Sequence, residues 1–130
     1  MWIKKKYIGI HYRGTDRKHN LNDILEKLKL NTVNENIINI FLATDDYEAF
    51  EKIENYSKNN NYNFHYNIKP INTNGKALHY TYSDKTQLTL NLLIDMYFLY
   101  KSNIFVESRS SNISIWINKM RNKNCIIFND

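Results

Sequence analysis

Short apolar runs alternate along this chain with segments whose apolar residues recur at helical spacing, and this alternation restricts the fold more than any other feature. The first run covers residues 7–10 and leads into a polar turn. Four apolar residues then recur at the spacing of one helix face: Leu21, Ile24, Leu25 and Leu28. A short apolar run suits a buried strand, and the spaced residues suit a helix that packs on it. The chain therefore begins with a predicted strand, turn and helix, with Asn20 or Asn22 as the helix cap.

The same alternation continues to the end of the sequence. Further strands are predicted at residues 37–42, 62–66, 104–106 and 125–128, and further helices from Ala49, from Ser83 or Asp84 to about Tyr100, and over about residues 112–122. Residues 67–84 are predicted as a loop long enough to suggest a function. Strands that alternate with helices imply right-handed crossovers and a mainly parallel sheet. The expected fold is a single α/β domain over residues 1–130, Rossmann-like, with three layers and helices on both faces of the sheet. Ligands of such sheets bind at the carboxyl ends of the strands.

Size and composition agree with one cytosolic domain. The 130 residues, 42% of them hydrophobic, are enough for one core. No apolar run reaches the length of a membrane span, and residues 1–3 lead into three lysines without the apolar stretch of a signal peptide. We therefore expect a cytosolic protein without a membrane span.

Charge and motifs narrow the class of ligand. The net charge of +5 favours an anionic partner, which includes nucleic acid, an acidic membrane surface or a phosphorylated small molecule. The basic residues alternate with acids over residues 48–58, whereas nucleic-acid binders concentrate them on one stripe, so no nucleic-acid partner is expected. The sequence has neither Gly-x-Gly-x-x-Gly nor a Walker loop. Its four histidines lack metal-ligand spacing, and one cysteine cannot complete a zinc set, so no metal or other cofactor is expected.

Three segments in order carry a resemblance to a known family. Residues 8–17, IGIHYRGTDR, resemble the His-x-Arg-x-x-Asp signature of the fucosyltransferases, in particular the alpha-1,6-fucosyltransferase and NodZ-like group. Residues 41–46, FLATDD, and residues 93–99, LIDMYFL, running into SRSSN at 108–112, follow in the same order. Residues 76–79, KALH, also resemble the family's loop before the third helix. The resemblance covers nearly the whole chain and implies the nucleotide-binding, C-terminal half of a GT-B glycosyltransferase.

The first motif supplies the candidate catalytic residues, Arg13 and Asp16. A guanidinium at a strand end can give a phosphate two charge-assisted hydrogen bonds, so Arg13 is expected to activate the diphosphate leaving group. His11 is expected to donate to phosphate or to support Arg13, although a histidine bonded within the sheet is the alternative.

The second motif and the loop add candidate substrate-binding residues. Asp45 is expected to bind sugar hydroxyls or to orient the arginine. Asp46 either joins it or simply caps the second helix. His79, in the loop that resembles the family's, is a further candidate.

Asp95 falls on a helix stripe made by Leu88, Leu92 and Leu99. A carboxylate on an apolar face needs a partner, since burying it alone costs several kcal/mol. The resemblance implies that it accepts hydrogen bonds from the guanine edge and so selects GDP. A structural ion pair with Arg13, or a bond to a helix-end amide, is the alternative.

Ser110, Ser111 and Asn112 precede the predicted fourth helix. Free N–H groups at a helix start, together with hydroxyls, form an anion site. Ser111 aligns with the family's phosphate-binding serine, and plain helix capping is the alternative for all three.

The sequence also departs from the family pattern. Gly14 stands where the group often has a second arginine, and the carboxylate expected past Asp16 is replaced around residues 20–21, with Asp23 the nearest acid. The N-terminal half of a GT-B enzyme is missing from the 130 residues. Three interpretations are open: the sequence is a fragment, or it is a domain whose cleft is completed by a separate chain or by self-association, or it is a remnant that binds without turnover. The resemblance implies inverting, metal-independent transfer from GDP-fucose to a glycan acceptor. The alternatives are a non-catalytic GDP or nucleotide-sugar-binding module and a basic nucleic-acid-binding α/β protein.

Overall fold

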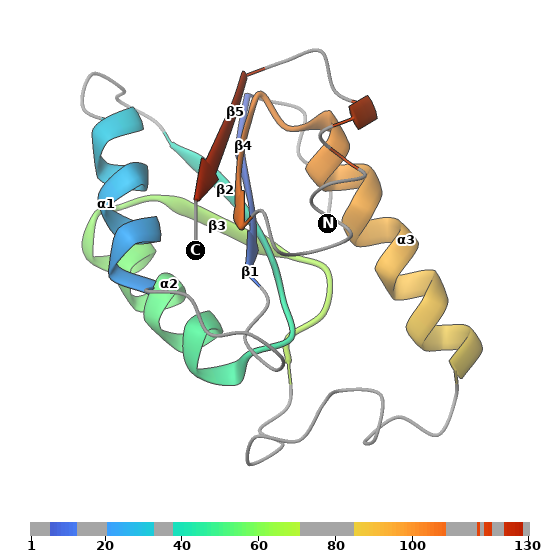
Figure 1. Cartoon of the computed structure of the whole chain (residues 1–130). Helices are drawn as coiled ribbons and strands as arrows, with labels where there is room; N and C mark the ends of the chain where they lie inside the picture. The colour runs from blue at the N-terminus through green and yellow to red at the C-terminus, as the bar shows by residue number, and fades with distance from the viewer. Residues whose placement is uncertain are drawn as a thin grey trace.

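A computed structural model describes residues 6–12, 21–32, 38–70, 85–108, 117, 119–120 and 124–128 of the chain. Its elements in order are β1 (Ile8–Tyr12), α1 (Leu21–Asn31), β2 (Asn39–Thr44), α2 (Tyr47–Asn59), β3 (Asn63–Tyr66), α3 (Lys85–Lys101), β4 (Ile104–Ser108) and β5 (Asn124–Phe128). The five strands form one sheet in the order β3-β2-β1-β4-β5, and every neighbouring pair is parallel. Figure 1 shows α1 and α2 on one side of this sheet and α3 on the other. The predicted Rossmann-like α/β fold with three layers is confirmed.

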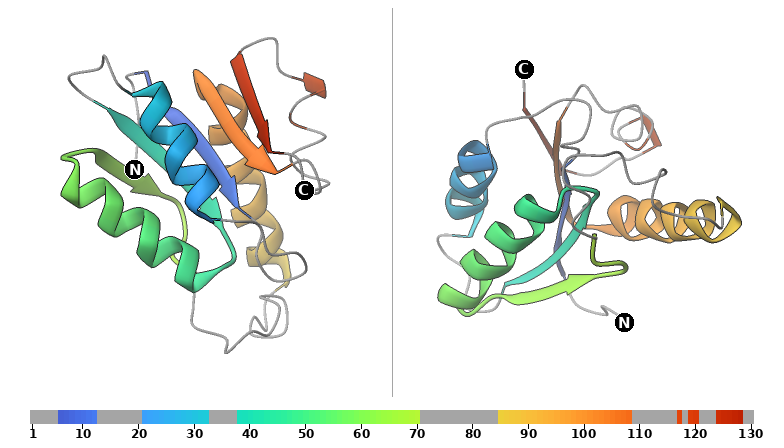
Figure 2. Two further views of the ribbon diagram at one scale, coloured as in Figure 1. Left: turned by 60° about the vertical axis from the view of Figure 1, so that its left-hand side comes forward. Right: turned by 90° about the horizontal axis from the view of Figure 1, so that it is seen from below.

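The strand order contains a point at which the chain reverses direction across the sheet. From β1 the chain moves outward through β2 to β3, and it then returns through α3 to place β4 on the opposite side of β1. The two views of Figure 2 show the crossover helices on opposite faces as a result. Crevices at such points, outside the carboxyl ends of the strands, are where ligands of open parallel sheets bind.

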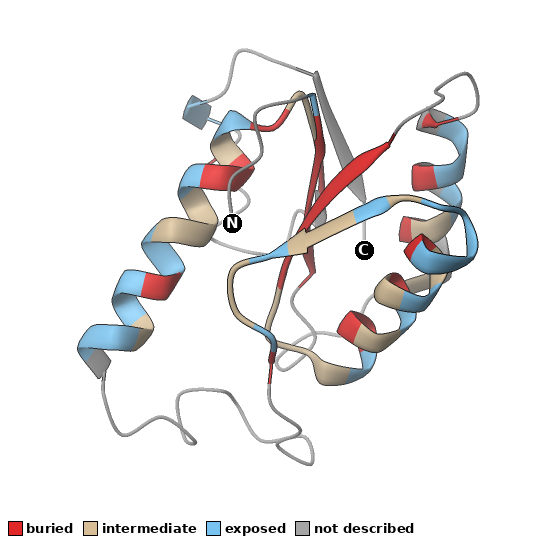
Figure 3. Cartoon of the chain, turned by 180° about the vertical axis from the view of Figure 1, so that it is seen from behind, coloured by how far each residue is buried: buried red, intermediate tan, exposed pale blue. Residues whose placement is uncertain are grey.

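The face of the sheet under α1 and α2 holds the larger core. It consists of alternate residues of the central strands and the inner faces of both helices: Ile8, Ile10, Tyr12, Ile24, Leu28, Ile38, Ile40, Leu42, Ala49, Phe50, Ile53 and Val106. Burying side chains of this size stabilises each by about 1.5–3 kcal/mol relative to exposure. Figure 3 shows the contrast between the buried central strands and the partly exposed edge strand β3.

The opposite face packs against α3 through a second, smaller cluster: Tyr7, Phe41, Ala43, Phe98, Leu99, Phe105 and Ile117. The Tyr7 hydroxyl donates to the carbonyl of Phe98, which fixes the C-terminal part of α3 over β1. Gly9 allows the helix to come this close. A Cβ at Gly9 would lie 2.9 Å from the Cβ and Oγ of Ser102, closer than real side chains approach.

Several element bounds differ from those predicted. β2 extends to Thr44, two residues beyond its predicted end, because its parallel pairing with β1 continues through the pair Tyr12 and Thr44. β4 likewise runs to Ser108 because it stays paired with β5 to that residue. Of the predicted helix over residues 112–122, residues 117, 119 and 120 are helical and the others lie outside the described residues.

Candidate functional site

Three of the polar residues singled out in the sequence, His11, Asp45 and Asp46, lie at or next to the carboxyl ends of β1 and β2. β1 ends at Tyr12 and β2 at Thr44, and these two residues form the last pair between the strands. The Thr44 hydroxyl donates to the Tyr12 carbonyl at 2.6 Å and accepts from the backbone N–H of Asp46 at 3.1 Å. This side chain therefore joins the ends of the two strands and shapes the turn into α2. Thr44 was predicted only as part of a polar segment after the strand.

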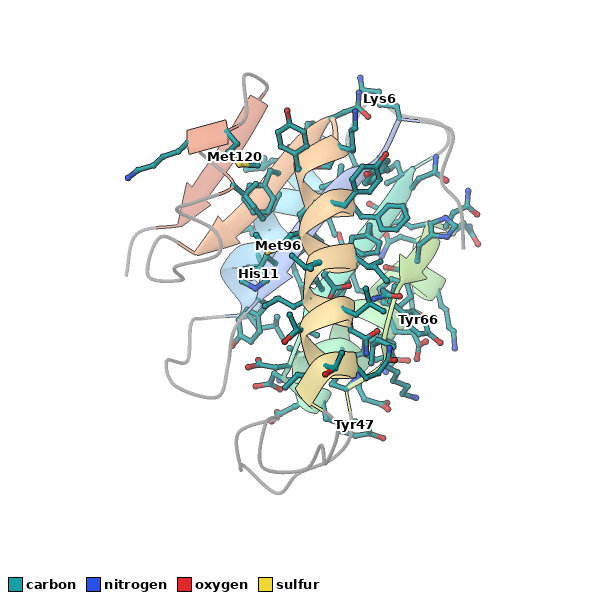
Figure 4. The ribbon with its side chains drawn as sticks, turned by 90° about the vertical axis from the view of Figure 1, so that its right-hand side faces the viewer. Lys6, His11, Tyr47, Tyr66, Met96 and Met120 are labelled. Carbon is teal, nitrogen blue, oxygen red and sulfur yellow. The ribbon has the colours of Figure 1, made fainter. Side chains whose placement is uncertain are left out.

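His11 lies next to last in β1 and is buried, with 9% of its surface exposed. Its neighbours in the sheet are Ala43 of β2 and Glu107 of β4. Side chains alternate along a strand, and Ile10 and Tyr12 belong to the core under α1 and α2. His11 therefore occupies the opposite face, the one covered by α3, and Figure 4 shows it beside that helix. His11 thus lies near the carboxyl end of β1, the central strand between β2 and β4.

Asp45 and Asp46 follow β2 directly, and both are partly exposed. Asp46 is the N-cap of α2, where its Oδ1 accepts a hydrogen bond from the backbone N–H of Ala49 at 2.9 Å. Such a cap contributes roughly 1 kcal/mol to helix stability. The geometry therefore shows the capping alternative for Asp46, and the N-cap residue is Asp46, not Asp45.

Asp95 lies on the side of α3 that packs on the sheet, but its neighbours differ from the predicted stripe. The buried residues of this face are Asn91, Phe98 and Leu99, whereas Leu92 is 40% exposed. The helix is apolar on nearly all sides, with Leu90, Leu93 and Tyr97 also exposed, so leucine spacing did not identify the inner face. The predicted stripe of Leu88, Leu92 and Leu99 was therefore wrong in Leu92, although the conclusion that Asp95 sits on an inward face holds.

The Asp95 carboxyl lacks the partners that a buried charge requires. Its Oδ1 is buried and has no hydrogen-bond partner in the described part of the chain. Burial raises the pKa of Asp95 from 3.8 to about 7, and the nearby Asn67 side chain opposes that shift. A carboxyl with this pKa is divided between its neutral and charged forms at neutral pH, so small changes in its surroundings decide which form it takes. Perturbed groups of this kind concentrate at functional sites.

Three amide side chains, two on α3 and one just after β3, are joined by hydrogen bonds and were not singled out in the sequence. Asn67, just after β3, donates from Nδ2 to the backbone carbonyl of Asn91 at 3.3 Å. Gln87 donates from Nε2 to Oδ1 of Asn91 at 3.0 Å. We call Asn67, Gln87 and Asn91 the amide seam, since they join α3 to the segment that leaves β3. Asparagine is abundant throughout the sequence, so nothing distinguished these positions before the fold was known.

Lys69 adds a positive charge near the carboxyl end of β3. Its Nζ lies 5.4 Å from the ring centre of Phe50 and 5.9 Å from that of Tyr47, and 4.0 Å from a carboxylate oxygen of Glu51. These contacts hold the segment after β3 against the start of α2. The Glu51 carboxylate also raises the pKa of the Tyr47 hydroxyl, through a hydrogen bond and its charge.

The structure thus places His11, Asp45 and Asp46 at the ends of neighbouring strands, and Asp95 on the helix that covers the sheet face of His11. The remaining candidates lie outside the described residues: Arg13, Asp16, His79, Ser110, Ser111 and Asn112. Within the described ranges no group of three or more His, Cys, Asp or Glu side chains is arranged to hold a metal ion. Nor does any helix in those ranges have the length and apolar character needed to cross a membrane.

Comparison of the sequence with protein-family models and with curated proteins gave no match.

Proposed function

We propose that this chain is a GDP-fucose-binding domain of the fucosyltransferase kind. The observation that carries the proposal is the Asp95 carboxyl, which lies on the sheet-facing side of α3 with a buried oxygen that no described group satisfies. It stands at the position where the motif resemblance calls for an acceptor of the guanine edge. Guanine offers adjacent N–H donors there, whereas adenine and uracil present a different set of donors and acceptors. A site built on such a carboxylate selects a guanine nucleotide.

The diphosphate and sugar would lie toward the switch point between β1 and β4. His11, near the end of β1, would donate to a phosphate oxygen, and Asp45, which follows β2 and is partly exposed, would accept from sugar hydroxyls. Asp46 supports this arrangement indirectly, because its side chain fixes the start of α2. Arg13, which follows β1 by one residue, would hold the β-phosphate, and Ser111 would contribute a hydroxyl to it. Asp16 is the second proposed catalytic residue, and His79, Ser110 and Asn112 complete the proposed substrate contacts.

In the proposed reaction the oxygen of an acceptor hydroxyl attacks the anomeric carbon of fucose from the face opposite the diphosphate. The bond between that carbon and the β-phosphate oxygen breaks, and GDP leaves with the electron pair while the acceptor proton passes to a base. Arg13 stabilises the negative charge that develops on the leaving group, so that no metal ion is needed. The proposed acceptor is a glycan, and the proposed compartment is the cytosol.

A calorimetric titration with GDP, GDP-fucose, UDP and ADP tests the proposal. GDP and GDP-fucose are expected to bind at least tenfold more tightly than UDP or ADP, which corresponds to about 1.4 kcal/mol. Equal affinities would refute the guanine assignment. Release of GDP from GDP-fucose, measured with and without a glycan mixture, then separates a transferase from a module that binds without turnover. Binding that falls steeply with salt and ignores the base would instead indicate a nucleic-acid partner.

A further inference from the structure

The amide seam leaves the Asp95 carboxyl poorly provided with hydrogen-bond donors. The Asn67 amide donates to the backbone carbonyl of Asn91, and the Gln87 amide donates to the Asn91 side chain. Asn91 is itself buried, and the Asn67 amide also forms a side-chain hydrogen bond with the Asp95 carboxyl. Oδ1 of Asp95 nevertheless remains without a partner within the described ranges. An ionised carboxylate in such a place loses its hydration without replacement, so the neutral acid is the favoured form.

Charged and titratable side chains of the strands that α3 covers can also affect the ionisation of Asp95. β1 brings Tyr7 and His11 to the face under α3, and the Tyr7 hydroxyl donates to the Phe98 carbonyl. β3 brings His65 to the same face, in register with Phe41, and burial lowers the pKa of this histidine and so favours its neutral form. β4 places Glu107 beside His11 in register, and β2 presents Phe41 and Ala43.

Lys101 lies in the last turn of α3, and its Nζ lies over the rings of Tyr97 and Tyr100. Tyr97 is on the exposed side of the helix, away from the sheet. The positive charge is therefore directed to the outer surface of α3. Burial has the largest effect on the pKa of Asp95 and raises it, whereas the hydrogen bond from the Asn67 amide lowers it.

We infer that ligand binding at this seam is linked to a proton: Asp95 holds a proton when the site is empty and releases it to solvent when guanine N–H donors reach its oxygens. The inference rests on the proposed function. Two guanine N–H donors would stabilise the charged carboxylate in the complex, whereas without the ligand Oδ1 of Asp95 has no partner within the described ranges. Nucleotide affinity therefore falls as the pH drops below 7, because the competing proton must first leave. Above about pH 8 the carboxylate is already ionised, and the affinity becomes constant.

The test uses GDP-fucose as ligand, since its β-phosphate is esterified and lacks the ionisation near pH 6 that a terminal phosphate undergoes. Affinity is measured by calorimetry at pH 6, 7 and 8. We expect binding to weaken by about tenfold from pH 8 to pH 6, for a group with a pKa of about 7. A pH effect carried by a positively charged histidine would run in the opposite direction, because it strengthens the binding of an anion as the pH falls.

A second readout counts the proton directly. Titration at pH 7 in two buffers of different ionisation enthalpy is expected to show release of about half a proton per ligand bound. Asp95→Asn, which cannot ionise, is expected to release none, and Glu48→Gln, at an exposed position on α2, to behave like the unsubstituted chain. A carbon NMR titration of the Asp95 carboxyl in the ligand-free protein, with its midpoint near pH 7, supports the inference without relying on either variant.

The outcomes separate the two proposals. Guanine-selective binding that is independent of pH and releases no proton would overturn the inference and leave the proposed function standing. Absence of guanine selectivity at pH 8 would overturn the proposed function, and the inference with it. An Asp95 carboxyl that titrates near pH 4 in the ligand-free protein would overturn the inference regardless of the binding result.

Discussion

Replacing Asp95 by asparagine is expected to make the protein more stable at high pH and to remove a specific part of its pH dependence. Asparagine has nearly the shape of the neutral acid but cannot ionise. The folded protein raises the pKa of Asp95 from 3.8 to about 7, so it binds this proton more tightly than the unfolded chain does. The resulting stability is present at low pH and is lost as the pH rises through 7.

The magnitude follows from the size of the shift. A difference of one between the folded and unfolded pKa corresponds to 1.36 kcal/mol, so a rise from 3.8 to about 7 amounts to about 4 kcal/mol in full. Roughly 2–3 kcal/mol of this falls between pH 5 and pH 8. For a domain of this size the corresponding change in Tm is roughly 10 °C.

The assay is urea unfolding of the unsubstituted protein, Asp95→Asn and Glu48→Gln at pH 5, 6, 7 and 8. Glu48 is the matched control because its carboxylate is 75% exposed and lies in an exposed pair with Lys52. The free energy of unfolding of the unsubstituted protein should fall by roughly 2–3 kcal/mol relative to Asp95→Asn between pH 5 and pH 8. Glu48→Gln should follow the unsubstituted protein throughout. Parallel pH profiles for all three proteins would show that Asp95 is not the buried, unpaired carboxyl described above.

Three further predictions concern other positions. Arg13→Lys should weaken GDP binding by roughly 1–3 kcal/mol, because lysine keeps the charge but not the bidentate contact with the β-phosphate. GMP, which has no β-phosphate, should bind almost unchanged. Unchanged GDP affinity in calorimetry would make Arg13 an ordinary surface charge. Gly9→Ala should destabilise the protein by about 1–3 kcal/mol in urea unfolding, because the new Cβ would meet Ser102. Adding Ser102→Gly should restore part of the lost stability. A Gly9→Ala variant with unchanged stability would contradict the close approach of α3 to β1. Asp46→Ala should cost about 1 kcal/mol of stability and Asp46→Ser much less, as a helix cap predicts; equal losses in thermal melts would refute the capping role.

The sequence was sufficient for the order of elements and for the class of fold. Apolar runs such as residues 40–43 are buried on both faces of a parallel sheet, and a continuous apolar run of this kind predicts a buried strand. The positions of His11, Asp45 and Asp46 at strand ends followed from the same reading. The strand order β3-β2-β1-β4-β5 did not, because strand pairing depends on contacts between distant residues.

The environment of Asp95 was only partly predictable. Because α3 is apolar nearly all round, the spacing of its leucines does not define which side meets the sheet, and Leu92 was assigned to the wrong face. The buried face instead includes Asn91, whose burial is possible because Asn67 and Gln87 bond to it from a neighbouring segment and from the preceding turn. Such amide contacts form between residues that no periodicity connects.

The ratio of GDP to ADP affinity at pH 8, measured for the unsubstituted protein, Asp95→Asn and Glu48→Gln, tests most directly the claim that Asp95 reads the guanine base. The account predicts a preference for GDP of at least tenfold in the unsubstituted protein and in Glu48→Gln. It predicts that Asp95→Asn, shown by a thermal melt to be folded, loses most of this preference while ADP affinity stays nearly the same. A preference that survives in Asp95→Asn, or that is absent from the unsubstituted protein, would contradict the claim.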